Sequence, residues 1–317
     1  MYAHRLMILA STLMTVSLAL GCDPETLADD ADGVVSLRPV GGGVWLNTSS
    51  IGTQTFSEFD ITGAVHDGVR FTGLRISRPG NTWLAATPEV TDGNLKGKAS
   101  KTTYVGVDLV GSRWQFNLVN GAVETPVEIW IDTFTQISPK EARYTFKTLD
   151  SNGVARPICD VDSAGSYNAI PVKDITVDSA IGDMASRAKT VYLACTSGAV
   201  GKAIVWGYRP WERPLADFEL ATRMVRADYC HDGMSWTETG IALQVRDKYN
   251  INTFLDATDP TEVVWQANRA ACIGTPRNPA FGPGAVTCDG QVVPTCPANL
   301  TMTTYGGTIF WTKLSVP

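Results

Sequence analysis

The sequence has few basic residues and, after its first 20 residues, no long apolar run. Its 26 lysines and arginines are outnumbered by 32 aspartates and glutamates, and no basic run offsets the formal net charge of −6. Such a surface repels phosphate backbones, so we expect no nucleic-acid partner. Because no later stretch approaches 18 apolar residues, the sequence predicts that the body of the protein lies outside the bilayer.

The sequence also lacks the short motifs that mark common hydrolases and metal sites. It contains no GxSxG, HExxH or CxxC pattern, and His66 and His231 are the only histidines after residue 4. His66 lies in a Val-His-Asp-Gly run that predicts a turn between strands. Residues 150–153 and 160–163 offer oxygen ligands for calcium, but turns use the same residue types. We therefore expect neither a metal nor another cofactor.

The first 21 residues have the pattern of an export signal. His4 and Arg5 precede an apolar run at 6–20, which is too short to span a bilayer of roughly 30 Å comfortably. The Leu-Ala-Leu-Gly-Cys sequence at 18–22 resembles a bacterial lipobox, although Ala19 stands where Leu is more usual. The sequence thus predicts cleavage before Cys22 and lipidation of its thiol. The alternative is plain secretion, with Cys22 left as an odd thiol.

An acidic segment follows the predicted anchor. Residues 22–33 have almost nothing to bury, so we interpret them as a flexible spacer. Two or three acyl chains on Cys22 would hold the protein firmly on a membrane. We therefore expect a membrane to be one binding partner of the protein. We expect an extracytoplasmic location in the cell envelope, at the outer membrane or cell surface rather than the inner membrane.

The other six cysteines all follow residue 150. An even number in an exported chain predicts disulfides, because that compartment is oxidising. The absence of cysteine from the preceding part suggests a domain boundary, with one domain at 34–150 and a disulfide-stapled one at 151–317. These cysteines are Cys159, Cys195, Cys230, Cys272, Cys288 and Cys296.

The predicted fold class is mainly β to α+β. The part before residue 150 has short apolar runs, several alternating with polar residues, between glycine-rich turns, which favours an antiparallel sandwich or barrel. Its predicted strands include 69–71, 104–110, 114–118, 127–131 and 142–146. The second part mixes predicted strands at 190–194 and 203–206 with predicted helices at 178–187, 214–226 and 260–271.

Two motifs in the second part resemble one protein family. They are ACTSGAVGKAIVWGYRPW at 194–211 and ATRMVRADYCHDG at 221–233. The chain resembles the ADYC domain family of bacterial, mainly myxobacterial, exported proteins, named for the run at 227–230. The likeness covers roughly residues 155 to 300. The resemblance implies that the protein is exported, but it indicates no biochemical activity.

The cysteine pattern departs from that family at two positions. Relatives usually carry cysteine where this chain has Ala203 and Ala221, so we interpret these as one disulfide replaced by two alanines. Fifteen pairings of the remaining six cysteines are possible. Sequence proximity favours Cys288 with Cys296, and our expectation for the others is Cys159 with Cys195 and Cys230 with Cys272.

The ADYC motif itself contains a candidate catalytic cluster. Asp228, Cys230, His231 and Asp232 could place an imidazole between two carboxylates as a general base. The resemblance argues against it, because relatives usually have glycine at position 231. Cys230 is also better explained as half of a disulfide than as a nucleophile. We therefore favour a structural role, with Arg223 or Arg226 paired to an acidic neighbour such as Asp228 or Asp217.

Aromatic residues beside an arginine form a candidate ligand surface. Stacking and cation–π contacts could recognise sugars or peptides there. Because aromatics next to disulfides also fill small cores, we favour a packing role within the fold. The residues concerned are Trp206, Tyr208, Arg209 and Trp211, together with Pro210.

Two hypotheses for function follow from the sequence. The first is a non-catalytic surface lipoprotein that binds a protein or glycan ligand or supports the envelope. The alternative is a secreted hydrolase acting on polysaccharide or peptide, with acid and base roles for Asp228, Asp232 or Glu238. That alternative requires two of these carboxylates within about 10 Å of each other in a cleft.

Overall fold

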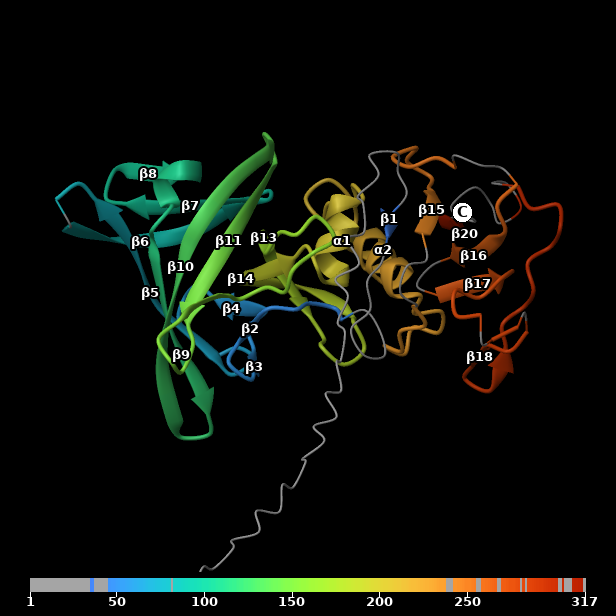
Figure 1. Ribbon diagram of the computed structural model, residues 1–317, viewed down its shortest axis with the longest axis horizontal. Coiled ribbons are helices and arrows are strands. Elements are labelled where there is room, and N and C mark those ends of the chain that lie inside the picture. Colours follow the sequence, from blue (N-terminus) through green and yellow to red (C-terminus); the bar gives the residue numbers. More distant parts are fainter. Residues whose placement is uncertain are drawn as a thin grey trace, which may run out of the picture.

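The computed structural model describes residues 35–36, 45–80, 82–237, 242–254, 258–266, 269–279, 281–282, 284–301, 304 and 310–315. The predicted signal peptide, the predicted lipidation residue Cys22, the predicted spacer and Glu238 lie outside these residues. A large sheet and a smaller sheet occupy opposite ends of the molecule, and two helices lie between them (Figure 1). In the described part of the chain, no helix has the length and apolar character needed to cross a bilayer.

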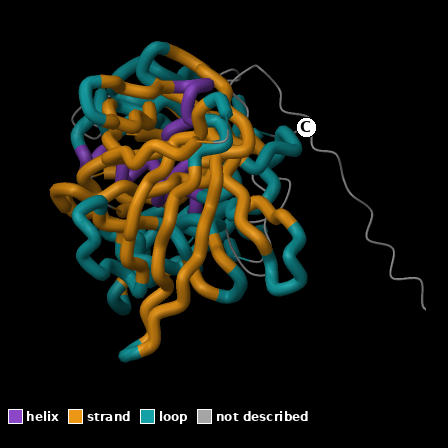
Figure 2. The backbone as a smooth tube through the Cα atoms, turned by 90° about the vertical axis from the view of Figure 1, so that its left-hand side faces the viewer, coloured by secondary structure: helices purple, strands orange, loops and turns teal. Residues whose placement is uncertain are grey.

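The large sheet is antiparallel and has 11 strands. Figure 2 shows its long strands side by side. In spatial order its main path is β4 (Glu58–Asp60), β14 (Met184–Cys195), β13 (Asn168–Val177), β11 (Glu141–Leu149), β10 (Val123–Ser138), β9 (Arg113–Asn120), β5 (Val69–Arg78), β6 (Thr82–Thr91), β7 (Asn94–Ala99) and β8 (Thr102–Val105). Strand β12 (Ala155–Pro157) pairs with β11 outside this path.

The alternation of apolar and polar residues explains the inner face of this sheet. On β11, Ala142, Tyr144 and Phe146 are buried, while the residues between them are partly exposed. Phe146 lies opposite the buried Ile131 of β10. The same sheet continues past residue 150, because Tyr144 of β11 pairs with Ala169 of β13. The large sheet therefore includes residues on both sides of the expected domain boundary.

Strands β13 and β14 are buried on both faces where they pair. Val191 and Leu193 point into the core of the large sheet, whereas Tyr192 and Ala194 pack toward the helices. This double burial accounts for the unbroken apolar run at the end of β14. The strand pair thus separates the two main hydrophobic cores and belongs to both.

The second core lies around the helices and the smaller sheet. Helix α1 (Ala199–Val205) and helix α2 (Leu215–Arg226) pack against β14 and against each other. The smaller sheet has the order β1 (Val35–Ser36), β15 (Ala242–Arg246), β20 (Phe310–Leu314), β16 (Thr261–Gln266) and β17 (Arg269–Ile273). Two short hairpins complete the described strands: β2 (Ser50–Ile51) with β3 (Gln54–Thr55), and β18 (Thr287–Cys288) with β19 (Gln291–Val292).

Several predicted elements are confirmed and others are wrong. The predicted helix at 214–226 corresponds to α2, which ends where Ala227 adopts a left-handed backbone conformation. The predicted strand at 203–206 is wrong, because residues 203–205 form the end of α1 and Trp206 is its C-cap. Gly201 lets α1 approach β14 closely, since a Cβ there would lie 2.1 Å from the Cys195 carbonyl oxygen. Tertiary contact here overrides the strand preference of Ile and Val.

The other errors have similar causes. The predicted helix at 178–187 is a turn followed by the start of β14, and the Asp178 carboxylate accepts the backbone N–H groups of Ala180 and Ile181 in that turn. The predicted helix at 260–271 is replaced by β16 and β17, whose apolar residues pack in the smaller sheet. The predicted strand at 104–110 ends at Val105, where the short 3-10 helix η1 (Gly106–Leu109) begins.

All six cysteines that the sequence predicts to be oxidised form disulfides. The expected pair Cys159–Cys195 is confirmed, whereas the other two expected pairs are wrong. Cys230 bonds to Cys288, and Cys272 bonds to Cys296. Cys288 lies in the β18–β19 hairpin, whereas a parallel bridge between Ile273 and Thr295 brings Cys296 to the end of β17.

Candidate functional site

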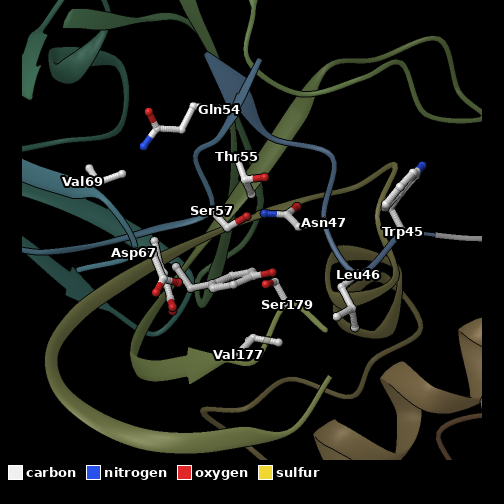
Figure 3. A pocket seen from close by; sticks show the side chains of 12 residues that line it. Trp45, Leu46, Asn47, Gln54, Thr55, Ser57, Asp67, Val69, Val177 and Ser179 are labelled. Carbon is white, nitrogen blue, oxygen red and sulfur yellow. The ribbon is translucent and has the colours of Figure 1, made fainter. Parts of the chain in front are cut away.

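A pocket of about 470 Å³ opens where the large sheet meets the segment at residues 45–47. Its wall comes from that segment, from β3 and the start of β4 with Ser57 between them, from the turn before β5, from the end of β13 and from Tyr192 of β14. In Figure 3, Ser57, Asp67 and Ser179 lie around one space, although they come from distant parts of the sequence.

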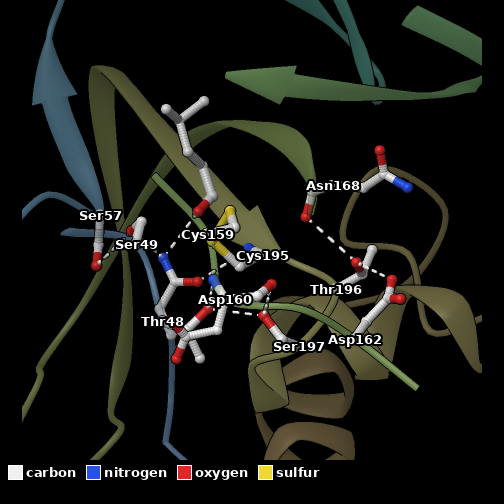
Figure 4. Close-up of a disulfide and its surroundings, with 12 residues drawn as sticks. Thr48, Ser49, Ser57, Cys159, Asp160, Asp162, Asn168, Cys195, Thr196 and Ser197 are labelled. Atoms are coloured by element: carbon white, nitrogen blue, oxygen red, sulfur yellow. Dashed lines mark hydrogen bonds between the residues drawn. A yellow bond between two sulfur atoms is a disulfide. The ribbon is translucent and has the colours of Figure 1, made fainter. Parts of the chain in front are cut away.

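Hydrogen bonds of Asn47 fix one wall of this pocket. Its side-chain nitrogen donates to the Leu193 carbonyl at 2.7 Å, and its oxygen accepts the backbone N–H of Cys195 at 2.9 Å. The Cys159–Cys195 disulfide holds the same end of β14, as Figure 4 shows. The Thr48 and Ser197 hydroxyls lie 2.7 Å apart beside it. The segment at 45–47 is therefore attached to β14 before any ligand binds.

Tyr192 belongs to the hydrophobic core around the helices and also lines this pocket. The residue is almost fully buried, and burial raises the pKa of its hydroxyl well above the usual value. The polar side chains of Ser57 and Asn47 near the hydroxyl lower this pKa in part, and burial remains the largest effect. A neutral, buried phenol among amide and hydroxyl groups can position a polar ligand, but it is unsuited to act as a base.

A carboxyl and imidazole cluster lies at the base of the pocket. Glu58 Oε1 lies 2.8 Å from His66 Nε2 and accepts a hydrogen bond from the Thr176 hydroxyl at 2.8 Å. Glu58 is buried, with 1% of its side chain exposed, whereas Asp67 is exposed beside it. We call Glu58, His66 and Asp67 the acidic cluster.

Burial controls protonation within the acidic cluster. Burial first, and then the neighbouring Asp67 carboxylate, raise the pKa of Glu58 to about 8. Burial also lowers the pKa of His66 below its ordinary value, and the nearby charge of Arg187 lowers it further. At neutral pH without a bound cation, Glu58 therefore carries a proton while His66 is neutral.

Replacing Glu58 with glutamine should reduce the pH dependence of stability in metal-free buffer. The folded protein binds the Glu58 proton more tightly than the unfolded chain does, so its stability falls as the pH rises from 4.5 to about 8. We expect Glu58→Gln to remove most of this fall, on the order of 4 kcal/mol, measured by urea unfolding across that range. The exposed Glu89→Gln variant should retain the wild-type slope, and an unchanged slope in Glu58→Gln would contradict the assignment.

The second histidine lies in another group that could hold a metal. Asp183, Glu219 and His231 offer ligand atoms within 4.8 Å of one another. Arg223 already occupies this group, because its guanidinium contacts Asp183 at 2.6 Å and Glu219 at 3.0 Å. These ion pairs supply the positive charge that a metal ion would bring.

The predicted catalytic cluster does not converge on one site. Asp228 is fully buried and pairs with Arg223 at 2.7 Å, in agreement with the structural interpretation, while burial raises its pKa. Its carboxylate also accepts the backbone N–H groups of Asp232 and Gly233, which shapes the ADYC turn. Cys230 is in a disulfide, and Asp232 is exposed. The hydrolase hypothesis thereby loses its main residue.

The residues of the predicted ligand surface do not form one exposed patch. Trp206 and Tyr208 are buried, with 6% and 0% of each residue exposed, so their rings do not face a ligand at the surface. Arg209 donates to Glu141 at 2.8 Å, and Trp211 packs against the second core and lies next to Gly93. Three of these side chains contribute to packing, and the arginine ties the ADYC motif to β11.

The candidate calcium loops are held as turns. Asp150 Oδ1 accepts the backbone N–H groups of Asn152 and Val154. Asp162 Oδ1 likewise accepts those of Ala164 and Ser166. Backbone groups thus already use the carboxylate oxygens that would bind calcium.

Comparison with known families gives one match. A family model described as the ADYC domain matches residues 106–279, which is more than half of the chain. The chain belongs to the ADYC domain family. No curated protein and no solved structure matches it. The ADYC match begins before residue 150 and includes β9, β10 and β11, consistent with the pairing of β11 to β13 in one sheet.

The pocket combines ADYC and N-terminal residues. Val177, Ser179 and Tyr192 lie within the family match, whereas Asn47, Glu58 and the other residues up to Val69 precede it. Sequence reasoning missed this site because β4 pairs with β14 across more than 130 residues of sequence. The signal that was present was His66-Asp67 in a turn, but its partner Glu58 has no characteristic spacing from it.

Proposed function

We propose that this ADYC domain protein is a lipid-anchored binding protein of the bacterial cell envelope that takes a small polyhydroxylated ligand, such as a sugar, in the pocket beside Tyr192. The observation that carries the proposal is the convergence of Thr55, Ser57 and Ser179 hydroxyls on one cavity. Its volume of about 470 Å³ falls in the ordinary range for small-molecule sites, roughly 300 to 1,000 Å³.

The pocket is suited to binding because its wall is fixed in advance. Asn47 is held by two hydrogen bonds to β14, and the Cys159–Cys195 disulfide holds the same strand end. A fixed wall reduces the ordering cost that a ligand must offset on binding. Hydroxyl and amide groups can both donate and accept, which matches the mixed hydrogen-bonding needs of sugar hydroxyls.

A bulky residue at the pocket mouth tests this proposal. Ser179 is exposed in the turn before β14, so tryptophan there should be tolerated by the fold while filling the cavity. We expect at least one saccharide from a panel of monosaccharides and disaccharides to bind the wild-type protein, measured by saturation-transfer NMR and calorimetry. Ser179→Trp should weaken that binding by about tenfold or more, which corresponds to about 1.4 kcal/mol.

The matched control is Thr125→Trp, at an exposed position of β10 that does not line the pocket. This variant should bind the same saccharide as tightly as the wild type. The proposal fails if no saccharide of the panel binds, or if Ser179→Trp binds as well as Thr125→Trp does.

A further inference from the structure

The acidic cluster at the base of the pocket has the donor atoms of a metal site. One ring nitrogen of His66 and one carboxylate oxygen each from Glu58 and Asp67 lie within 4.8 Å of one another. Three protein ligands of this kind are enough for a site that keeps a position open to water or to another ligand. The open side would face the pocket, because Glu58 and Asp67 both line it.

An unpartnered oxygen points to a missing cation. Glu58 Oε2 is buried, with only 1% of the Glu58 side chain exposed, and no donor among the described residues lies in hydrogen-bonding geometry with this atom, although the Asp67 carboxyl and the Val177 backbone both influence the Glu58 carboxyl group. Buried carboxylate oxygens are normally paired with a donor, a cation or a metal. Glu58 forms no ion pair with a lysine or arginine of the described chain, and the imidazole 2.8 Å away on His66 is neutral at neutral pH.

The other histidine cluster shows what a satisfied arrangement looks like. Asp183, Glu219 and His231 surround the guanidinium of Arg223, whose ion pairs bring positive charge to that group. In the acidic cluster, no guanidinium takes that place within the described part of the protein. The two groups have the same types of residue, and they differ in whether a guanidinium contacts the carboxylates directly, since Arg187 acts on His66 through its charge but forms no ion pair with Glu58 or Asp67 in the described part of the protein.

The surroundings of the acidic cluster also favour a cation. A shallower hollow of about 510 Å³ adjoins the pocket and shares Asp67, Val177 and Ser179 with it. Asp67 and Asp178 line this hollow, together with Asp183, which is paired with Arg223. A concave surface lined with carboxylates raises the local concentration of cations.

We propose that Glu58, His66 and Asp67 bind one divalent transition-metal ion, with Zn²⁺ as the best fit to the donors. An imidazole ligand favours a first-row transition metal over Ca²⁺ or Mg²⁺, and two carboxylates with one imidazole are an acceptable set for zinc. The Thr176 hydroxyl lies 2.8 Å from Glu58 Oε1 and 3.3 Å from His66 Nε2, so it contacts both ligands and would help to fix their orientation. Metal binding here stands apart from the proposed saccharide function.

The test uses Zn²⁺ alone with chelator-treated protein whose disulfides are intact. We expect dialysis followed by metal analysis to give one Zn²⁺ per chain, and calorimetry to give a single binding step. His66→Ala and Asp67→Asn should each weaken this step by tenfold or more. Asp67 is exposed, so Asp67→Asn should keep the fold even if His66→Ala does not.

His231→Ala is the matched control, because it removes the histidine of the cluster that Arg223 already neutralises. It should leave the affinity for Zn²⁺ unchanged, and Ca²⁺ should not compete at equal concentration. The proposal is overturned if the wild type binds no stoichiometric Zn²⁺, if Asp67→Asn binds as the wild type does, or if His231→Ala alone abolishes binding. Saccharide binding is measured separately, so failure of one proposal leaves the other open to its own result.

Discussion

Replacing Arg277 with alanine is expected to lower the free energy of unfolding by about 3 to 5 kcal/mol, because it leaves a buried carboxylate unpaired. Arg277 and Glu262 both have 0% of their side chains exposed, and two guanidinium nitrogens lie 2.9 and 3.0 Å from the Glu262 carboxylate oxygens. Arg277 also donates to the carbonyls of Met224 and Val225 near the end of α2. It therefore joins the smaller sheet to the helix that precedes the ADYC turn.

Urea unfolding followed by fluorescence measures this loss. The control is Arg269→Ala, whose partner Asp289 lies 3.7 Å away with 89% of its side chain exposed. Exposed pairs of this kind contribute about 0 to 1 kcal/mol, so the control should remain near the wild-type stability. Equal stabilities for the two variants would show that the buried pair does not hold α2 to the smaller sheet.

Replacing Cys22 with alanine is expected to move nearly all of the protein from the membrane fraction to the soluble fraction. The reason is that the proposed acyl chains on this thiol contribute about 0.8 kcal/mol for each buried methylene, which is lost with the sulfur. Cell fractionation and detergent phase partition measure the change. Thr26→Ala alters a neighbouring residue of the predicted spacer and should leave the protein with the membranes. A Cys22→Ala protein that still partitions with membranes would refute the anchor.

The sheet strands were predictable where burial is one-sided. On β11 the alternation of Ala142, Tyr144 and Phe146 with polar residues is a local signal that the fold obeys. The residues of α1 gave the opposite signal, since Ile204 and Val205 favour a strand when taken alone. Their helix packs against α2, which is a tertiary contact that residues 203–205 alone do not encode.

For the disulfides too, one feature was predictable from the sequence and another was not. Oxidation of all six cysteines follows from their even number and from the expected compartment, and the structure agrees. The partner of Cys230 depends on where the β18–β19 hairpin lies against the ADYC turn, which is a long-range contact. Nearness in sequence therefore predicted the wrong bond between Cys288 and Cys296.

The pocket could not be predicted from sequence spacing. Its parts meet because β4 pairs with the middle of β14 and because Asn47 bonds to the end of that strand. Serine, threonine and asparagine are common turn residues, so nothing in the sequence marks those that face the cavity. The aromatic residues of the ADYC motif gave a stronger local signal, and Trp206 and Tyr208 serve the core instead.

A crystal structure of the protein soaked with the saccharide that binds it best tests the central claim most directly. The account predicts electron density for the sugar in the cavity beside Tyr192, with its hydroxyls in hydrogen-bonding contact with Ser57 and Ser179. Sugar density on another face of the molecule, with this cavity holding only solvent, would contradict it.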